Sequence, residues 1–232
     1  VVILSDALQL ANRPGRLVEA IHVIKNRFPG ALLWAPGIGG PDNCAVLSWF
    51  GIDLFDTTRT RQAAAHGAVL TWNGPRFALE GENSDSHWMG ALADVHSAIS
   101  TNSLRELAQS QSLNSPRLVE HMRNHDKLIS SSEGILSQVV SSGSALRVHS
   151  IESHDDPVIL DWVDFISNKY EAPSGLDDVL ILLPCSARKP YSSSRSHKAF
   201  RRAINHNSAH EVIVTSPLGL VPRDLEEVWP AG

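Results

Sequence analysis

The chain has 232 residues, of which 42% are hydrophobic and 19% charged, so it is long enough to form one large or two modest domains. Its net charge of −5 argues against a simple basic nucleic-acid-binding module, although a local basic patch remains compatible with RNA binding. No apolar run approaches the roughly 20 residues that cross a bilayer, so we expect no membrane partner.

The first part of the chain, residues 1–80, alternates strand-like and helix-like segments. Apolar runs predict strands at 1–4, 31–34 and 52–56, and Leu17, Ile21 and Ile24 fall at helical spacing within 16–27. A second helix is expected over 43–49, after a loop rich in glycine and proline. Strands separated by helices of this length indicate βα units on a parallel sheet.

Residues 87–140 show apolar side chains at the spacing of amphipathic helices. His121 and His125 lie one helical turn apart, the spacing at which two histidines can share a metal ion. Because no third ligand lies nearby, we interpret them as part of a solvated helix face. The serine-rich stretch at 141–144 predicts a domain boundary.

From residue 144 onwards a second α/β unit is expected. Asp156 and Pro157 signal the start of a helix, and the apolar run 179–183 is typical of a central parallel strand. The next strand is expected at 211–215. A right-handed crossover would bring the loops after Leu183 and Thr215 to the same sheet edge, where α/β sheets bind ligands. We predict a three-layer α/β domain with a parallel sheet.

The loop after the first of these strands carries the most informative pattern, PC-x3-KPY-x2-S-x2-H, with seven fixed positions in fourteen from Pro184 to His197. Cys185 becomes a nucleophile when nearby cations lower its pKa, and Arg188 and Lys189 supply positive charge. A lone cysteine is more often a small buried hydrophobic residue, and this alternative stays open. His197 is the candidate for proton transfer, because its reference pKa lies near neutral pH.

Other residues of this segment have two interpretations each. Tyr191 and Ser194 either orient a substrate by hydrogen bonds or form a Pro-Tyr turn and a helix cap. Six cations within fifteen residues either hold phosphates or form a solvated helix face; they are Arg188, Lys189, Arg195, Lys198, Arg201 and Arg202. With only Cys44 besides Cys185, the cysteine content suits a reduced, cytoplasmic protein.

The motif resembles the signature of the archaeal archaeosine synthases, paralogues of tRNA-guanine transglycosylase that modify a deazaguanine base already inserted in tRNA. The resemblance implies that an amine donor, free lysine, is added to the nitrile of 7-cyano-7-deazaguanine in the D-arm of archaeal tRNA. A radical enzyme partner would then complete the formamidine. Cys185 would be the nucleophile, Lys189 would depress its pKa or hold a phosphate, and Tyr191, Ser194, Arg188 and Arg195 would bind the substrate. A homodimer stays open, and no cofactor is expected.

Residues 51–74 are similar to the last barrel strands of tRNA-guanine transglycosylases. The resemblance implies that residues 1–80 are the closing βα units of a TIM barrel, that 81–143 form a helical connector, and that 144–232 form the α/β domain, incomplete at its end. In that family the aspartate at the place of Asp56 attacks the target ribose, whereas an ordinary strand-end aspartate is the alternative. Transglycosylases continue with a zinc site of three cysteines and a histidine, but residues 82–88 contain no cysteine and only His87, so we expect no metal.

Three functions follow, in order of preference. The first is a tRNA-modifying transferase of the archaeosine synthase type. The second is a base-exchanging transglycosylase, for which Asp56 argues and against which the absent zinc site argues. The third is a non-catalytic tRNA-binding subunit. Because the chain starts at Val1 without a methionine, we interpret it as a fragment of a longer protein.

Overall fold

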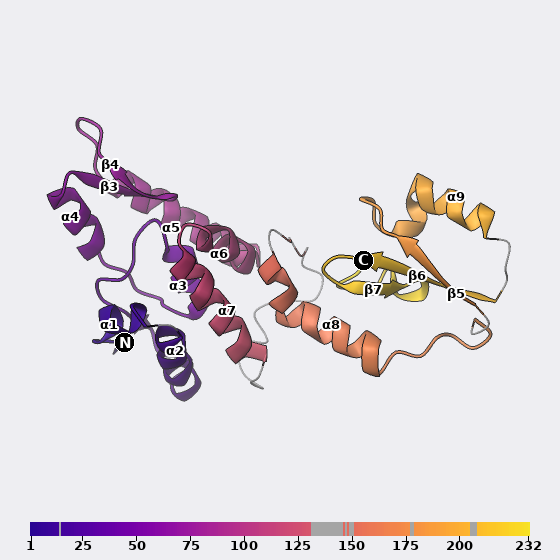
Figure 1. Cartoon of the computed structure of the whole chain (residues 1–232). Helices are drawn as coiled ribbons and strands as arrows, with labels where there is room; N and C mark the ends of the chain where they lie inside the picture. Colours follow the sequence, from indigo (N-terminus) through magenta and orange to yellow (C-terminus); the bar gives the residue numbers. More distant parts are fainter. Residues whose placement is uncertain (14, 131–145, 147, 149–150, 177–178, 205–207) are drawn as a thin grey trace. The chain divides into compact units, whose positions relative to one another are not determined.

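The computed structural model of the chain describes residues 1–13, 15–130, 146, 148, 151–176, 179–204 and 208–232. It divides into two compact units, Val1–Ser141 (unit 1) and Ser142–Gly232 (unit 2), whose elements are labelled in Figure 1. None of the helices in the described ranges is both long and apolar enough to cross a membrane.

Unit 1 opens with the alternating strands and helices that the sequence predicts. β1 runs parallel to β2, with Val2 opposite Leu33, and Trp34 forms a further parallel bridge to Leu54 in place of the third predicted strand. The parallel arrangement is therefore confirmed, although the strands are short. The elements are β1 (Val2–Ile3), α1 (Ala7–Ala11), α2 (Arg16–Arg27), β2 (Leu33–Trp34), α3 (Cys44–Phe50) and α4 (Thr58–Ala65).

A hairpin and three helices complete unit 1. The strands of the hairpin, β3 (Ala68–Thr71) and β4 (Gly74–Phe77), pair antiparallel, and Gly74 supports the turn with a φ of 107°. The helical stretch predicted from residue 87 consists, in the part that the structure describes, of α5 (Asp85–Ser100), α6 (Leu104–Ser112) and α7 (Pro116–Ser130).

The side chain of Gln111 links these later helices to α3. Its Oε1 accepts hydrogen bonds from the backbone N–H groups of Ala45 (2.7 Å) and Val46 (3.3 Å), and its Nε2 donates to the carbonyl of Pro41 (2.9 Å). The first N–H groups of a helix have no partner within that helix, so Gln111 on α6 satisfies two of them on α3. Gln111 is fully buried, and this contact joins the two parts of unit 1 through a polar group.

The interpretation of His121 and His125 as a solvated helix face is wrong. Each side chain is only 2% exposed, and the ring centroid of His125 lies 4.8 Å from that of Phe50. The spacing that makes α7 amphipathic places both histidines on the same stripe as the buried Met122 and Ile129. They are core residues of unit 1.

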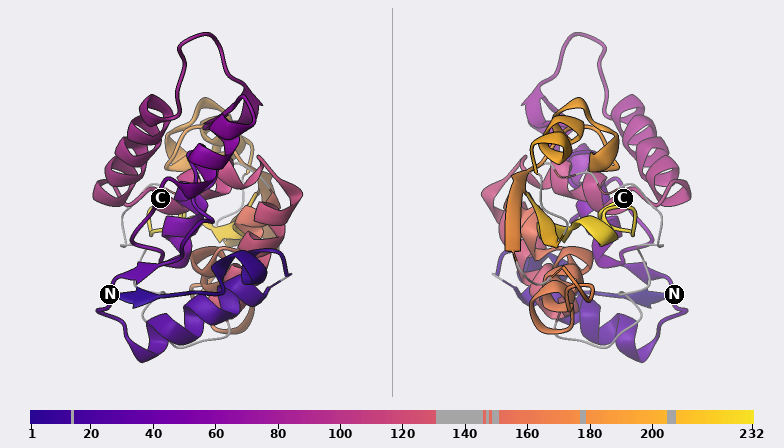
Figure 2. Two further views of the ribbon diagram at one scale, coloured as in Figure 1. Left: turned by 90° about the vertical axis from the view of Figure 1, so that its left-hand side faces the viewer. Right: turned by 90° about the vertical axis from the view of Figure 1, so that its right-hand side faces the viewer.

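Unit 2 contains a three-stranded sheet of mixed direction. β5 and β6 are parallel, with Pro184 opposite Val214, and the predicted parallel pair is confirmed. β7 returns antiparallel along β6, with Gly219 opposite Thr215, so the sheet is not purely parallel as predicted. The elements are α8 (Pro157–Asn168), β5 (Val179–Pro184), α9 (Arg195–Ala203), β6 (Ala209–Thr215) and β7 (Gly219–Pro222), and Figure 2 shows the strands side by side.

Two further expectations about unit 2 have opposite outcomes. α8 starts where the sequence predicts, because the Asp156 side chain accepts a hydrogen bond from the N–H of Val158 (2.9 Å). β5, by contrast, is not a central strand among the described elements. It pairs with β6 alone, and Leu180 and Leu182 are 63% and 57% exposed.

Candidate active site

The residue after β5, Cys185, is exposed at the carboxyl end of the parallel pair. Because Pro184 pairs with Val214, the chain leaves β5 and β6 at the same edge of the sheet. Lys189 from the first loop and Thr215–Leu218 from the second line a common cavity of about 350 Å³. The predicted proximity of the two loops is confirmed, and the exposure of Cys185 excludes the alternative of a buried structural cysteine.

The other cysteine has a contrasting environment. Cys44 is fully buried at the start of α3, and burial raises the pKa of its thiol to about 12. A thiol with such a pKa is inert near neutral pH, because the thiolate is the reactive form. Of the two cysteines, only Cys185 is therefore accessible to a substrate.

The buried imidazole of His197 uses both of its ring nitrogens in hydrogen bonds. Nε2 lies 2.9 Å from the carbonyl oxygen of Pro184, and Nδ1 lies 2.9 Å from Nη2 of Arg223. A guanidinium can only donate, so Nδ1 accepts and Nε2 carries the hydrogen that it donates to Pro184. Burial and the adjacent charge of Arg223 lower the pKa of His197, so the ring is neutral at physiological pH.

Arg223 is itself fixed by two carboxylates. Its Nε and Nη2 lie 2.8 and 2.7 Å from Oε2 of Glu211, and its Nη1 donates to Glu226 (2.9 Å). Glu226 also accepts a hydrogen bond from the backbone N–H of Ser192 (3.0 Å). Sequence reasoning did not identify Arg223, Glu211 or Glu226, because they lie outside the motif and only the fold brings them to it.

Tyr191 and Ser194 are buried within unit 2. Oη of Tyr191 donates to Oγ1 of Thr215 (3.3 Å), which links the motif loop to the end of β6. Ser194 caps α9, since its Oγ accepts from the N–H of His197 (3.2 Å). For Ser194 the helix-cap alternative is therefore confirmed.

The basic residues of the segment lie at the surface. The ammonium of Lys189 lies 5.8 Å from the ring centroid of Tyr191, and its partial burial lowers the pKa of this lysine. The cations of α9 share the exposed side of a helix that buries His197 on its other side. Within the described part of the chain, no ion pair neutralises these exposed cations, which are Arg188, Arg195, Lys198, Arg201 and Arg202.

The remaining candidate, Asp56, lies in unit 1, whereas the other seven predicted site residues lie in unit 2. Its Oδ2 accepts hydrogen bonds from Nε1 of Trp34 (3.1 Å) and the N–H of Gly37 (2.9 Å). Its Oδ1 accepts from the N–H of Thr58 (2.8 Å). Burial opposes ionisation, but these donors outweigh it and lower the pKa of Asp56. The carboxylate joins the loop after β2 to the start of α4.

Residues 82–88, where the sequence predicts that no metal binds, contribute Glu82 and His87 to a polar cluster with Arg76. Glu82 forms an ion pair with Arg76, and Nε2 of His87 lies 3.0 Å from Oε1 of Glu82. Among the residues that the structure describes, no group of three or more histidine, cysteine or acidic side chains is placed to hold a metal. One carboxylate paired with arginine and one imidazole do not fit a tetrahedral zinc site.

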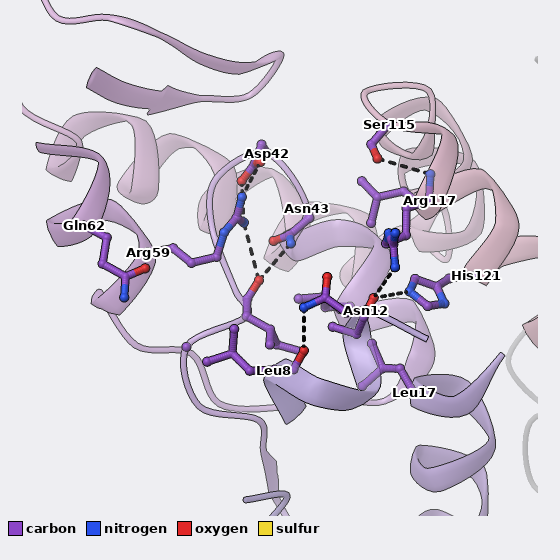
Figure 3. Close-up of a pocket in the computed structure, with 15 residues that line it drawn as sticks. Leu8, Asn12, Leu17, Asp42, Asn43, Arg59, Gln62, Ser115, Arg117 and His121 are labelled. Atoms are coloured by element: carbon purple, nitrogen blue, oxygen red, sulfur yellow. Dashed lines mark hydrogen bonds and ion pairs between the residues drawn. The ribbon is translucent and has the colours of Figure 1, made fainter. Parts of the chain in front are cut away.

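A second cavity, of about 310 Å³, lies in unit 1 and was not predicted from the sequence (Figure 3). On one side Arg59 makes two 2.8 Å hydrogen bonds to the Asp42 carboxylate. On the opposite side Arg117 and His121 approach the backbone carbonyl of Ala11. These hydrogen bonds use Arg59, Asp42, Arg117 and Nε2 of His121, whereas Nδ1 of His121 has no hydrogen-bond partner among the described residues.

Comparison with known proteins places this site in a family context. Residues 159–232 match a family model described as a domain of unknown function, DUF5591. The archaeosine synthase subunit alpha of Methanosarcina acetivorans is 33% identical over 99% of this chain and 41% of that protein. The archaeosine synthase subunit alpha of Thermoplasma acidophilum is 32% identical over 99% of this chain and 45% of that protein. The archaeosine synthase of Haloferax volcanii is 30% identical over 99% of this chain and 42% of that protein.

The chain thus spans less than half the length of the curated relatives that it matches. The alignments nevertheless include both units, so the resemblance is not restricted to the cysteine motif. Along nearly its whole length the chain is therefore similar to archaeosine synthases, as the motif predicts.

Proposed function

We propose that this chain is part of a tRNA-modifying transferase of the archaeosine synthase type, in which Cys185 attacks the nitrile of 7-cyano-7-deazaguanine in the D-arm of archaeal tRNA. The observation that carries the proposal is the exposed Cys185 at the carboxyl end of β5, in the same loop as Lys189, which lines the cavity at this edge of the sheet. The names of the relatives support the reaction class.

The reaction has two additions that balance without an oxidant or a reductant. The Cys185 thiolate forms a carbon–sulfur bond to the nitrile carbon, one π bond of the nitrile breaks, and its nitrogen takes up a proton, which gives a thioimidate. The amine donor, which we propose to be free lysine, then adds to the same carbon. Collapse of the adduct expels the thiolate and leaves an amidine. Cysteine divides one difficult addition into two easier ones. A radical enzyme partner would then cleave the lysine adduct to the formamidine.

The cations around the loop have two roles in this proposal. Lys189 stabilises the thiolate or holds a phosphate, and its lowered pKa reflects partial burial at the cavity. Arg188 and the exposed cations of α9, which include Arg195, bind the tRNA backbone, because phosphate contacts supply most of the affinity in such complexes. Tyr191 and Ser194 hold the loop from within the unit.

We further propose that the parallel segments of unit 1 are closing βα units of a transglycosylase-like barrel. In this proposal Asp56 fixes the strand ends, since three hydrogen bonds already occupy its carboxylate. Base exchange at the ribose is therefore not the activity that we propose for this chain.

The test uses the full-length enzyme and tRNA that carries the cyano base. Without an amine donor, the wild-type protein should accumulate a tRNA adduct on Cys185, identified by mass spectrometry of the digested protein. Cys185→Ala should abolish modification and leave tRNA affinity nearly unchanged. Cys44→Ala is the matched control and should retain both activities. Normal turnover by Cys185→Ala would refute the covalent mechanism, and a full-length enzyme that never modifies the base would favour the binding subunit.

A further inference from the structure

We propose that His197 and Arg223 are positioning residues that fix the backbone before Cys185, and that His197 does not transfer protons in the reaction. The proposal rests on the proposed function only in that Cys185 is the reacting group. Arg223 lies outside the motif and belongs to the segment that follows β7.

The hydrogen bonds of His197 leave it no free site for a proton. Nε2–H is donated to the carbonyl of Pro184, and the lone pair of Nδ1 accepts from Arg223. To accept the thiol proton, His197 would have to take it at Nδ1, and that nitrogen would then carry a hydrogen directed at a guanidinium 2.9 Å away. Two donors that face each other repel, so uptake of the proton would require Arg223 to move.

Arg223 is not free to move away. Glu211 on β6 and Glu226 both pair with it, and the side chains of Arg223 and Glu226 are only 17% and 7% exposed. An ion pair that is largely removed from solvent holds its geometry better than an exposed one, because loss of one partner leaves an uncompensated charge. The imidazole is therefore locked between a fixed cation and a backbone carbonyl.

The same network fixes both ends of the reactive loop. His197 binds the carbonyl of Pro184, the residue directly before Cys185, and Glu226 binds the N–H of Ser192, directly after the motif tyrosine. Residues 185–191 therefore extend between two anchored points, while Cys185 itself stays exposed. Restricting the loop reduces the conformations from which the thiolate can reach a nitrile, which is the advantage that a positioned nucleophile has in catalysis.

The decisive variant is His197→Gln in the full-length enzyme. The glutamine amide can donate to Pro184 and accept from Arg223, but it cannot act as a base near neutral pH. We expect His197→Gln to keep the rate of base modification within about threefold of wild type. His197→Ala and Arg223→Met should lose roughly tenfold or more in kcat with little change in KM for tRNA. If His197 is a general base, His197→Gln should be as slow as His197→Ala, by roughly a hundredfold or more, and this result would overturn the proposal.

A second measurement does not depend on the tRNA reaction. Cys44 is buried with a raised pKa, so of the two cysteines of this chain only Cys185 should react with iodoacetamide between about pH 6 and 9, and mass spectrometry of the Cys185 peptide follows its rate. The positioning role predicts the same midpoint of the pH–rate profile for alkylation in wild type and His197→Gln. A midpoint that rises in His197→Gln would show that the imidazole stabilises the thiolate, and would also refute the proposal. If Cys185→Ala retains turnover while these alkylation results hold, the proposed covalent role of Cys185 is refuted. The positioning role of His197 and Arg223 is then still supported.

Discussion

The buried histidine His125 should make unit 1 sensitive to acid. Its side chain is 2% exposed and packs against the rings of Phe50 and Trp49. Neither ring nitrogen has a hydrogen-bond partner among the described residues. Burial, followed by the nearby charge of Arg105, lowers the pKa of His125 from 6.5 to about 3.

The sign and size of the effect follow from this shift. Below pH 6.5, His125 is protonated in the unfolded chain but stays neutral in the folded chain, so protonation favours unfolding. The free energy of unfolding of unit 1 therefore decreases progressively as the pH falls from about 6.5 towards 3. One unit of pH corresponds to about 1.4 kcal/mol, so at about pH 4.5 the loss is roughly 2 to 3 kcal/mol.

The assay is urea unfolding of the wild-type chain and of His125→Leu at several pH values from about 7.5 to 4.5. Hydrogen exchange in α3 and α7 assigns the transition to unit 1. Leucine keeps an apolar side chain against Phe50, so the variant should unfold with a smaller loss of stability on acidification. His96→Leu, which removes an exposed histidine on α5, is the matched control. Identical pH dependence in the wild type and His125→Leu would refute the reasoning.

Two further predictions concern the proposed RNA contact and the role of Asp56. Replacement of both Arg201 and Arg202 by glutamine should weaken tRNA binding by the full-length protein. It should also reduce the slope of the logarithm of the association constant against the logarithm of salt concentration by about one to two. Filter binding over a series of salt concentrations measures both effects, and Arg61→Gln in unit 1 is the control. Asp56→Asn should lower the melting temperature, at a cost of roughly 1 kcal/mol, because an amide N–H would replace an accepting oxygen at a partly buried site. Modification of the nitrile by the full-length enzyme should stay intact, and complete loss of modification in a folded variant would contradict the structural role.

Features that depend on local sequence were predicted well. The helix over residues 16–27 and the start of α8 at Asp156 are specified by apolar spacing and by a capping residue, both of which act within a few residues. That the chain leaves β5 and β6 at the same edge of the sheet follows from the parallel direction of the two strands, which aligns their carboxyl ends. These parts of the candidate site required no knowledge of distant contacts.

The features that were missed depend on contacts distant in sequence. Whether a polar residue on an amphipathic helix is solvated or buried depends on what packs against it, and the contact between His125 and Phe50 joins α7 to α3, which are far apart in the sequence. The reversal of β7 depends on the short turn before Gly219, whose φ is 74°, whereas the sequence predicted only a loop after Thr215. Nothing in the sequence around Arg223 indicates its role, because its partners Glu211 and His197 lie on β6 and α9.

The geometry also changes how the cysteine motif is to be understood. A pattern of one cysteine with lysine, tyrosine, serine and histidine suggests a set of reacting groups, as in a catalytic dyad or triad. In the structure Tyr191, Ser194 and His197 are buried and hydrogen-bonded within unit 2. Only Cys185 and Lys189 of these five face solvent.

A nucleophile that does not use His197 as its base is consistent with the chemistry that we propose. The thiolate is the reactive form of a cysteine, and a nearby cation stabilises it. The proton that the nitrile nitrogen takes up can come from water at an exposed loop. The fixed residues would then contribute by limiting the positions of the loop, and their loss should reduce kcat without changing the protonation state of the thiol.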